Sequence, residues 1–215
     1  MSISVNGTVI VGGTTGDIRT SVDLSSAVGW TNQAGTGGPT STINTTATQI
    51  ELAVPSGVAI GQRFSLAFHD GYLDGVGMDV IMRIRAATLD VGSDDYIQLI
   101  LIDTGNTIFL QARVDGASLV SASSSSGAST SRTVSGILGG SGWLRIVQIG
   151  GSALIYAGVG SGSSMPTSWT ACGAVSISIT SARLIRLRVG LTREQPGTVN
   201  ATAEIGNITF SDSVI

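Results

Sequence analysis

Short stretches in which apolar and polar residues alternate recur along most of the chain and predict β-strands. In residues 79–85, for example, Val80, Met82 and Ile84 fall on one face of the expected strand. Gly, Asn, Asp and Ser, which favour turns, separate these stretches. No window of a dozen residues has helical periodicity without glycines or clustered β-branched residues. The pattern therefore predicts an all-β protein. The expected strands are residues 49–54, 63–68, 79–85, 96–102, 107–114, 143–149, 152–156, 175–179, 183–191 and 201–210.

Two local features sharpen this pattern. Residues 143–149 and 152–156 alternate on either side of a Gly-Gly pair, which predicts a hairpin. Trp143, which opens it, is expected to lie inside the core. Near the C-terminus the apolar positions shift by one residue after Ile205, which predicts a β-bulge at Gly206-Asn207.

Two segments depart from the regular strand spacing. Residues 1–45 hold few apolar residues and are expected to form an irregular N-terminal arm or irregular strands, separate from a β-sandwich domain of residues 46–215. Residues 121–136 are rich in serine and predict a loop, with an edge strand as the alternative.

The chain resembles concanavalin A-like (laminin-G-like) β-sandwiches. The resemblance rests on Trp143 opening one strand, Tyr156 in its partner and Trp169 after a small-residue loop, together with residues 187–191 and 203–210. It implies an antiparallel two-sheet sandwich of the jelly-roll type.

The same resemblance raises glycoside hydrolysis, which needs paired carboxylates around one glycosidic bond. The glutamates Glu51, Glu194 and Glu204 are isolated in the sequence, and none is followed by an acidic residue two positions on. We therefore expect no enzyme activity.

Composition and charge narrow the classes of function and site that this chain can have. The net charge of −3 argues against nucleic-acid binding, and no apolar run or basic leader predicts a membrane span or a secretory signal. The single cysteine, Cys172, excludes an internal disulfide and is expected to be a buried thiol. Because His69 is the only histidine, a histidine-based zinc site or catalytic triad cannot be assembled.

Aspartates near turns are the only metal candidates. Asp70, Asp74 and Asp79 carry oxygen ligands of the kind that Ca²⁺ binds, although the spacing of an EF-hand is absent. Asp90, Asp94 and Asp95 form a second, similar cluster. Ordinary turns with Asx hydrogen bonds are the alternative for both clusters, so no cofactor is expected, and calcium stays open.

Two kinds of surface residue are candidates for binding. Trp30, Tyr72 and Trp169 are the aromatic residues expected outside the core, where they would serve as platforms for sugars. The positive charge comes entirely from arginine, and a group of arginines on strands would line a partner interface if their strands share one sheet. These arginines are Arg83, Arg85, Arg113, Arg186 and Arg188.

Two functional hypotheses follow. The first is a non-enzymatic structural protein of a virus particle, located in the virion as a capsid decoration (cement) or fibre-type protein. Its partners would be a capsid or other virion protein, and a homo-oligomer is expected. The alternative is a carbohydrate-binding, lectin-like module with a cell-surface glycan as partner. Neither hypothesis involves nucleic acid or a membrane.

Overall fold

The fold is nearly all β-strand. The computed structural model describes residues 2–5, 8–12, 18–57, 64–74, 78–103, 108–149, 151–177 and 184–212. The helix assigned in these ranges is the short 3₁₀ turn η1 (Val91–Ser93). None of the described helices is long and apolar enough to cross a membrane.

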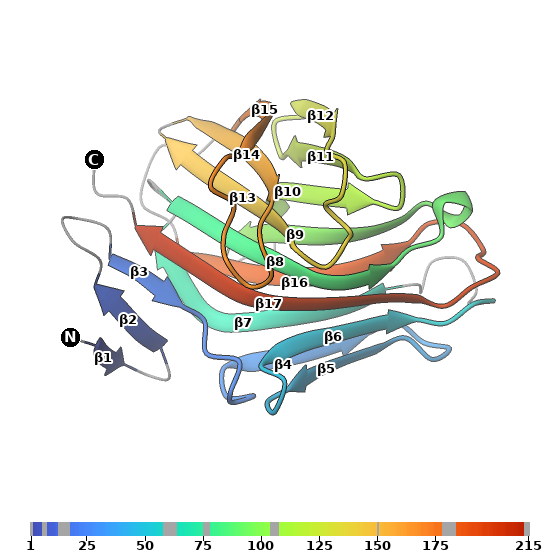
Figure 1. Ribbon diagram of the computed structural model, residues 1–215, viewed down its shortest axis with the longest axis horizontal. Coiled ribbons are helices and arrows are strands. Elements are labelled where there is room, and N and C mark those ends of the chain that lie inside the picture. The colour runs from blue at the N-terminus through green and yellow to red at the C-terminus, as the bar shows by residue number, and fades with distance from the viewer. Residues whose placement is uncertain are drawn as a thin grey trace.

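The strands form two antiparallel sheets that pack face to face (Figure 1). The ten-stranded sheet contains β1 (Ser2–Val5), β2 (Thr8–Gly12), β3 (Ile18–Ser21), β5 (Thr40–Asn44), β6 (Gln49–Val54), β8 (Met78–Thr88), β13 (Gly142–Ile149), β14 (Ser152–Val159), β15 (Thr170–Ser176) and β17 (Ala201–Asp212). The seven-stranded sheet contains β4 (Trp30–Ala34), β7 (Phe64–Asp74), β9 (Asp95–Asp103), β10 (Ile108–Asp115), β11 (Leu119–Ser124), β12 (Ser129–Thr133) and β16 (Leu184–Arg193). The predicted antiparallel sandwich is confirmed.

Long-range pairing sets the order of the strands. The seven-stranded sheet runs β12-β11-β10-β9-β16-β7-β4, and the ten-stranded sheet is built around β17 and β8. The first half of β17 pairs with β6, whereas Thr209 and Phe210 pair with β3. The pairing of β17 with β8 slips between Gly206 and Thr209, where Asn207 has a φ of 48°. The bulge predicted at Gly206-Asn207 is therefore confirmed.

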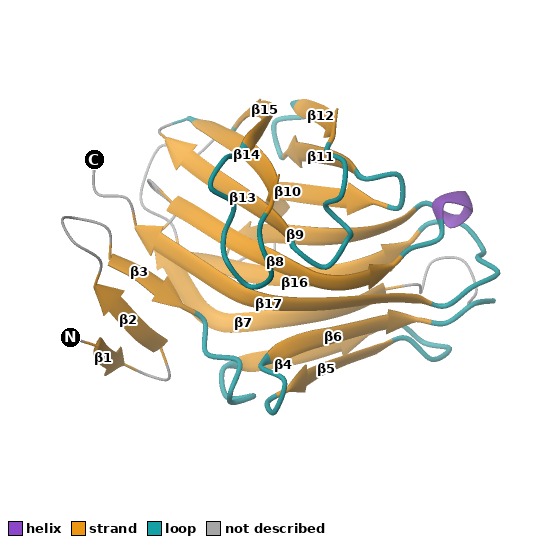
Figure 2. Cartoon of the chain, viewed as in Figure 1, coloured by secondary structure: helices purple, strands orange, loops and turns teal. Residues whose placement is uncertain are grey.

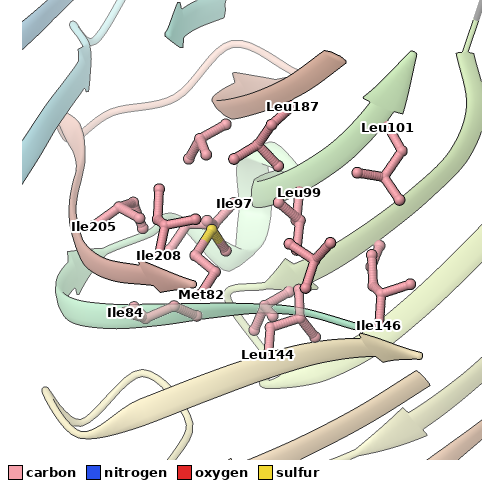
Figure 3. Packing of buried hydrophobic residues seen from close by; sticks show 14 of the residues in the cluster. Met82, Ile84, Ile97, Leu99, Leu101, Leu144, Ile146, Leu187, Ile205 and Ile208 are labelled. Atoms are coloured by element: carbon pink, nitrogen blue, oxygen red, sulfur yellow. The ribbon is translucent and has the colours of Figure 1, made fainter. Parts of the chain in front are cut away.

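The core lies between the two inner faces and follows from strict alternation along each strand. Met82, Ile84, Leu144 and Ile146 from the ten-stranded sheet belong to the same buried cluster as residues of the seven-stranded sheet (Figure 3). The residues labelled there from the opposing sheet are Ile97, Leu99, Leu101 and Leu187. Each fully buried aliphatic side chain of this size contributes about 1.5–3 kcal/mol. We call the opposite face of each sheet its outer face.

The predicted hairpin is β13–β14, with Ile149 paired to Ser152 across the turn. Trp143 is only 2% exposed, as expected. The expected place inside the core is corrected, however: Leu144 belongs to the core cluster, so its neighbour Trp143 points to the outer face. The loop that follows β14 covers it there, where a Cβ on Gly160 would approach Trp143 Nε1 to 2.8 Å. Figure 2 shows such loops on this side of the sandwich.

The serine-rich segment 121–136 corrects our expectation of a loop and confirms the alternative of an edge strand, because most of it lies in or between β11 and β12, and β12 ends the sheet. β12 lies beside β15 of the other sheet (Figure 1). The hydroxyl of Thr130 donates to the carbonyl of Cys172 (2.9 Å), and Ser124 donates to that of Ser176 (2.6 Å). Side chains thus occupy main-chain acceptors that an edge strand would otherwise expose.

The opposite side of the sandwich is joined in the same way. The Ser65 hydroxyl on β7 donates to the carbonyl of Thr40 on β5, and Ser41 donates to Asn32 on β4 (3.0 Å). Within residues 1–45, β4 and β5 are therefore edge strands of the sandwich, whereas β1–β3 extend the ten-stranded sheet beyond it (Figure 1). The division into an arm and a domain at residue 45 stays a prediction.

A buried ion pair fastens one end of the sandwich. Arg193 donates from Nε and Nη2 to the two carboxylate oxygens of Asp95 at 2.7 and 2.9 Å, and both side chains are 0% exposed. The same guanidinium donates to the carbonyls of Pro55 (3.1 Å) and Val199 (2.7 Å). Asp95 also accepts the backbone N–H of Asp90 (2.7 Å). The pair thereby links β9 and β16 to segments beside β6 and β17.

Loss of this pair should strongly destabilise the fold. Arg193→Ala leaves the Asp95 carboxylate buried without its counter-charge, so we expect unfolding to become easier by about 3–5 kcal/mol. Urea denaturation followed by tryptophan fluorescence measures this change. Arg132→Ala, at an exposed arginine on β12, is the matched control and should cost less than half as much. Equal losses in the two variants would contradict the assigned role of the pair.

Candidate functional site

A polar hollow opens on the outer face of the seven-stranded sheet, beside η1. The η1 turn itself lies at one end of the molecule (Figure 2). The volume of the hollow is about 260 Å³. Its lining residues come from η1, β9, β10, β11, the adjoining turns and the residue after β16, and they include Tyr96, Arg113 and Glu194. We call this cavity the Tyr96 hollow. The remaining residues that line it are Val91, Asp94, Asp95, Asp115, Gly116, Ala117 and Ser121.

Arg113 is held between an aromatic ring and a carboxylate. Its guanidinium carbon lies 4.3 Å from the centroid of the Tyr96 ring, and its Nη1 lies 3.7 Å from Glu194 Oε1. Burial raises the pKa of the Tyr96 hydroxyl, whereas the nearby charge of Arg113 pulls it down. The Arg113 and Glu194 side chains remain 35% and 50% exposed, so both charged groups are accessible to a ligand.

A chain of hydrogen bonds fixes this arrangement from below. Arg113 Nη2 donates to Gln111 Oε1 (3.2 Å), and Gln111 donates to Gln98. Gln98 Nε2 in turn donates to the Thr192 hydroxyl (2.7 Å). Both glutamines are buried, so their donors and acceptors are set before any ligand arrives.

The close packing of this network requires a glycine. Gly190 lies opposite Gln98 on one side and opposite Leu66 on the other. A Cβ at this position would come within 2.4 Å of Leu66 and 2.9 Å of Gln98 Nε2. The absence of a side chain therefore lets Gln98 lie flat against the sheet.

Two aspartates beside the hollow, Asp90 and Asp95, accept hydrogen bonds from protein donors. The Asp90 carboxylate accepts the backbone N–H of Gly92 (3.1 Å), the hydroxyl of Ser93 (2.8 Å) and the backbone N–H of Thr198 (3.3 Å). Asp95 is bound by Arg193, as described above. Across the described ranges, no group of three or more His, Cys, Asp and Glu residues could hold a metal ion.

Of the first calcium candidates, Asp79 can be placed. Its two carboxylate oxygens accept hydrogen bonds from Nε and Nη2 of Arg145 at 2.9 and 2.7 Å, and the carboxylate is buried. The side chains of Asp70 and Asp74 lie outside the described part of the structure. Calcium binding by these three aspartates stays a prediction.

The three aromatic residues predicted to bind sugars are not brought together. Trp30 is half-buried on β4 and packs against the core cluster, so it differs from the expected exposed platform. Trp169 lies over Arg145 on the outer face of the ten-stranded sheet, 5.6 Å from its guanidinium carbon to the ring centroid. The backbone of Tyr72 is in β7, but its side chain is outside the described residues.

The predicted arginine-lined face is divided between the two sheets, because the chain crosses from one sheet to the other between β8 and β9. Arg83 and Arg85 lie on β8, whereas Arg113, Arg186 and Arg188 lie on β10 and β16. The single arginine face is therefore wrong. Some of these arginines have internal roles: Arg83 lies over Trp143, and Arg85 donates to the carbonyl of Ala47 (2.6 Å). Burial lowers the pKa of Arg188 and of Arg83. A role for the five residues in partner binding stays a prediction.

Two glutamates that are isolated in the sequence are neighbours in space. Glu51 on β6 pairs directly with Glu204 on β17, and both point to the outer face of the ten-stranded sheet. The Glu51 Oε1 atom accepts hydrogen bonds from Asn44 (2.7 Å) and Gln49 (2.9 Å). A hollow of about 280 Å³ borders both carboxylates. Isolation in the sequence therefore does not mean isolation in the folded protein, because strand pairing brings Glu51 and Glu204 together.

Sequence reasoning missed Tyr96 and Glu194 as site residues. They are almost a hundred positions apart and meet only because β9 and β16 are adjacent strands. Arg113 was predicted as an interface residue, and the hollow gives it a more specific setting. The nearest signal in the sequence was the acidic cluster directly before Tyr96, which marks the turn that η1 forms.

Known proteins share the fold without close sequence similarity. No family model matches the chain, and no curated protein matches it in sequence. Among solved structures, a sialidase has a TM-score of 0.63 at 9% identity; the alignment covers 93% of this chain but only 21% of the sialidase. A legume lectin-like domain from Entamoeba histolytica has a TM-score of 0.56 at 9% identity, covering 85% of this chain and 89% of that domain. The exoplasmic/lumenal domain of VIP36, in a Ca²⁺/Man3GlcNAc-bound form, has a TM-score of 0.57 at 9% identity, with 87% of each chain covered.

These comparisons establish the architecture. The protein has the concanavalin A-like sandwich of legume-lectin-like domains, as the resemblance in its sequence implied. At identities this low they establish the fold alone.

Removing one charge from the Glu51–Glu204 pair should stabilise the protein. Like charges directly opposite on adjacent strands repel, so Glu204→Gln should raise the free energy of unfolding by about 0.2–1 kcal/mol. The gain should shrink when salt screens the carboxylates. Urea denaturation at low and high ionic strength measures both effects, with Glu194→Gln as control. A destabilised Glu204→Gln variant would show that the pair is not repulsive.

The hydrogen bonds to Asp90 should make the fold sensitive to acid. The Ser93 hydroxyl, followed by the N–H groups of Thr198 and Gly92, lowers the pKa of Asp90 in the folded protein. The contribution of ionised Asp90 to stability is therefore complete above the pKa of about 3.9 in the unfolded chain. It is lost as the pH falls through the lower pKa of the folded protein. In thermal melts between pH 2 and 6, Asp90→Asn should therefore lose less melting temperature on acidification than the unmodified protein. Asp94→Asn is the control. A melting temperature of Asp90→Asn that falls as steeply with pH as that of the unmodified protein would contradict this role of Asp90.

Proposed function

We propose that this protein is a carbohydrate-binding, lectin-like module whose ligand occupies the Tyr96 hollow. The observation that carries the proposal is the fixed polar network around this hollow. Arg113 offers donors and Glu194 offers an acceptor within one accessible depression, and the buried Gln111 and Gln98 hold the Arg113 guanidinium in place. Sugar hydroxyl groups both donate and accept hydrogen bonds, and a site whose polar groups are already oriented loses little entropy on binding them.

The structural neighbours support the same proposal. The VIP36 domain that shares this fold is described in a Ca²⁺/Man3GlcNAc-bound form, and the Entamoeba histolytica neighbour is a legume lectin-like domain. These neighbours favour the carbohydrate interpretation over the capsid-decoration or fibre interpretation. The virion role, the homo-oligomer and a dependence on calcium stay predictions.

Variants at the hollow test the proposal on a glycan array. Arg113→Gln and Glu194→Gln should each weaken binding about ten- to a hundred-fold, because a hydrogen bond to a charged group contributes about 1.5–3 kcal/mol. Arg132→Gln, on the same sheet but outside the hollow, should bind as the unmodified protein does. Each array should be repeated with a chelator, which measures the dependence on calcium.

Two outcomes would overturn the assignment. Binding that survives both hollow variants would place the ligand elsewhere. Binding that disappears instead in Trp169→Ala would place it on the outer face of the ten-stranded sheet. An array on which no glycan binds the unmodified protein would reject the carbohydrate function.

A further inference from the structure

A second and larger hollow adjoins the first. It has a volume of about 610 Å³ and lies over the outer face of β10, β11 and β12. Arg113 and Ser121 line both hollows, so the two depressions form one continuous surface. We call the second depression the serine hollow. Its other lining residues are Leu119, Ala122, Ser123, Ser129, Thr130 and Ser131.

The hydroxyl groups of the serine hollow are arranged in facing pairs. Ser121 lies opposite Ser131, and Ser123 lies opposite Ser129. All four point outward, because Val120 and Ala122 between them belong to the core. In the part of the chain that the structure describes, none of these four hydroxyls has a hydrogen-bond partner in the protein.

The same hairpin uses its other hydroxyls quite differently. Ser124, Ser126 and Thr130 all donate to carbonyls of β15, which joins the edges of the two sheets. The need to protect a sheet edge therefore explains these three residues. It does not explain the paired serines of the outer face, whose hydroxyls stay available to a ligand.

The joined surface is longer than a single sugar ring. It runs from Glu194, at the end of β16, across β9, β10 and β11 to Ser131 on β12. Four strand spacings of about 4.8 Å make this distance roughly 19 Å. A monosaccharide in the Tyr96 hollow would leave the serine hollow empty.

The charge of the serine hollow indicates the class of ligand. Arg113, at its inner end, is the only charged residue among those that line it. Four free hydroxyls without further charge suit uncharged hydroxyl groups better than phosphate, sulfate or carboxylate groups, which bind where several cationic donors converge.

From these observations we propose that the joined hollows bind an uncharged, linear oligosaccharide that crosses β9 to β12. One end contacts Arg113 and Glu194, and later units contact the paired serines. This inference rests on the proposed carbohydrate function and adds the length and charge of the ligand.

Calorimetry with sugars of increasing length tests the inference. The probes are malto-, cello-, manno- and xylo-oligosaccharides of one to six units, titrated into the full chain. In at least one series we expect the affinity to rise ten-fold or more between one unit and four. Ser123→Tyr, which fills the serine hollow, should remove this gain and leave the binding of the single sugar unchanged. Thr202→Tyr, at an exposed strand position on the other sheet, is the matched control and should keep the gain.

The outcomes separate this inference from the function on which it rests. Equal affinities for one unit and for longer chains would overturn the inference and leave the carbohydrate function standing. A gain with length that persists in Ser123→Tyr would overturn the placement in the serine hollow. Tighter binding of sulfated or carboxylated chains of the same length would overturn the choice of an uncharged ligand. Failure of every sugar, on the array as well as in solution, would reject the proposed function itself.

Discussion

The buried ion pair between Asp95 and Arg193 is the constraint on which the functional end of this sandwich depends. Its two carboxylate–guanidinium hydrogen bonds fix the register of β9 against β16, and the carbonyls of Pro55 and Val199 hold the guanidinium from the other sheet. Side chains alternate along a strand, so each residue after the pair must point the opposite way. These residues are Tyr96 and Glu194. The ion pair thus covers one end of the core, and the residues that follow it, Tyr96 and Glu194, point to the candidate site on the outer face of the seven-stranded sheet.

Most of the fold could be predicted from the sequence, because its determinants are local. Alternation over a few residues showed the strands, a Gly-Gly pair showed the β13–β14 hairpin, and a phase shift showed the bulge at Asn207. One exception was the serine-rich segment, whose hairpin has few apolar residues. β11 and β12 are strands because they pair with β10 and because their hydroxyls reach β15, and neither partner is visible within the segment itself.

Apart from Arg113, the candidate site could not be predicted, because its residues meet through long-range register. Tyr96 and Arg113 stand on separate strands and Glu194 directly follows a third, whereas Glu51 faces Glu204 from more than a hundred positions away. Alternation within a strand shows which residues share its face but not which sheet the strand joins. The arginines on β8 and β16 resembled one face for this reason, although the two strands belong to opposite sheets. A different order of the strands would therefore bring different residues together, although the alternation within each strand would be the same.

The hydroxyls that join the sheet edges bear on how this chain avoids aggregation. Only 12% of its residues are charged and 42% are hydrophobic, a balance that leaves little electrostatic repulsion between molecules. Ser124, Thr130 and Ser65 instead occupy the main-chain carbonyls through which strands of different molecules would pair. Repulsion between charges fades at high ionic strength and near the isoelectric point, but a carbonyl that already holds a hydrogen bond stays occupied. At these two edges, protection against pairing between molecules therefore depends on geometry more than on charge.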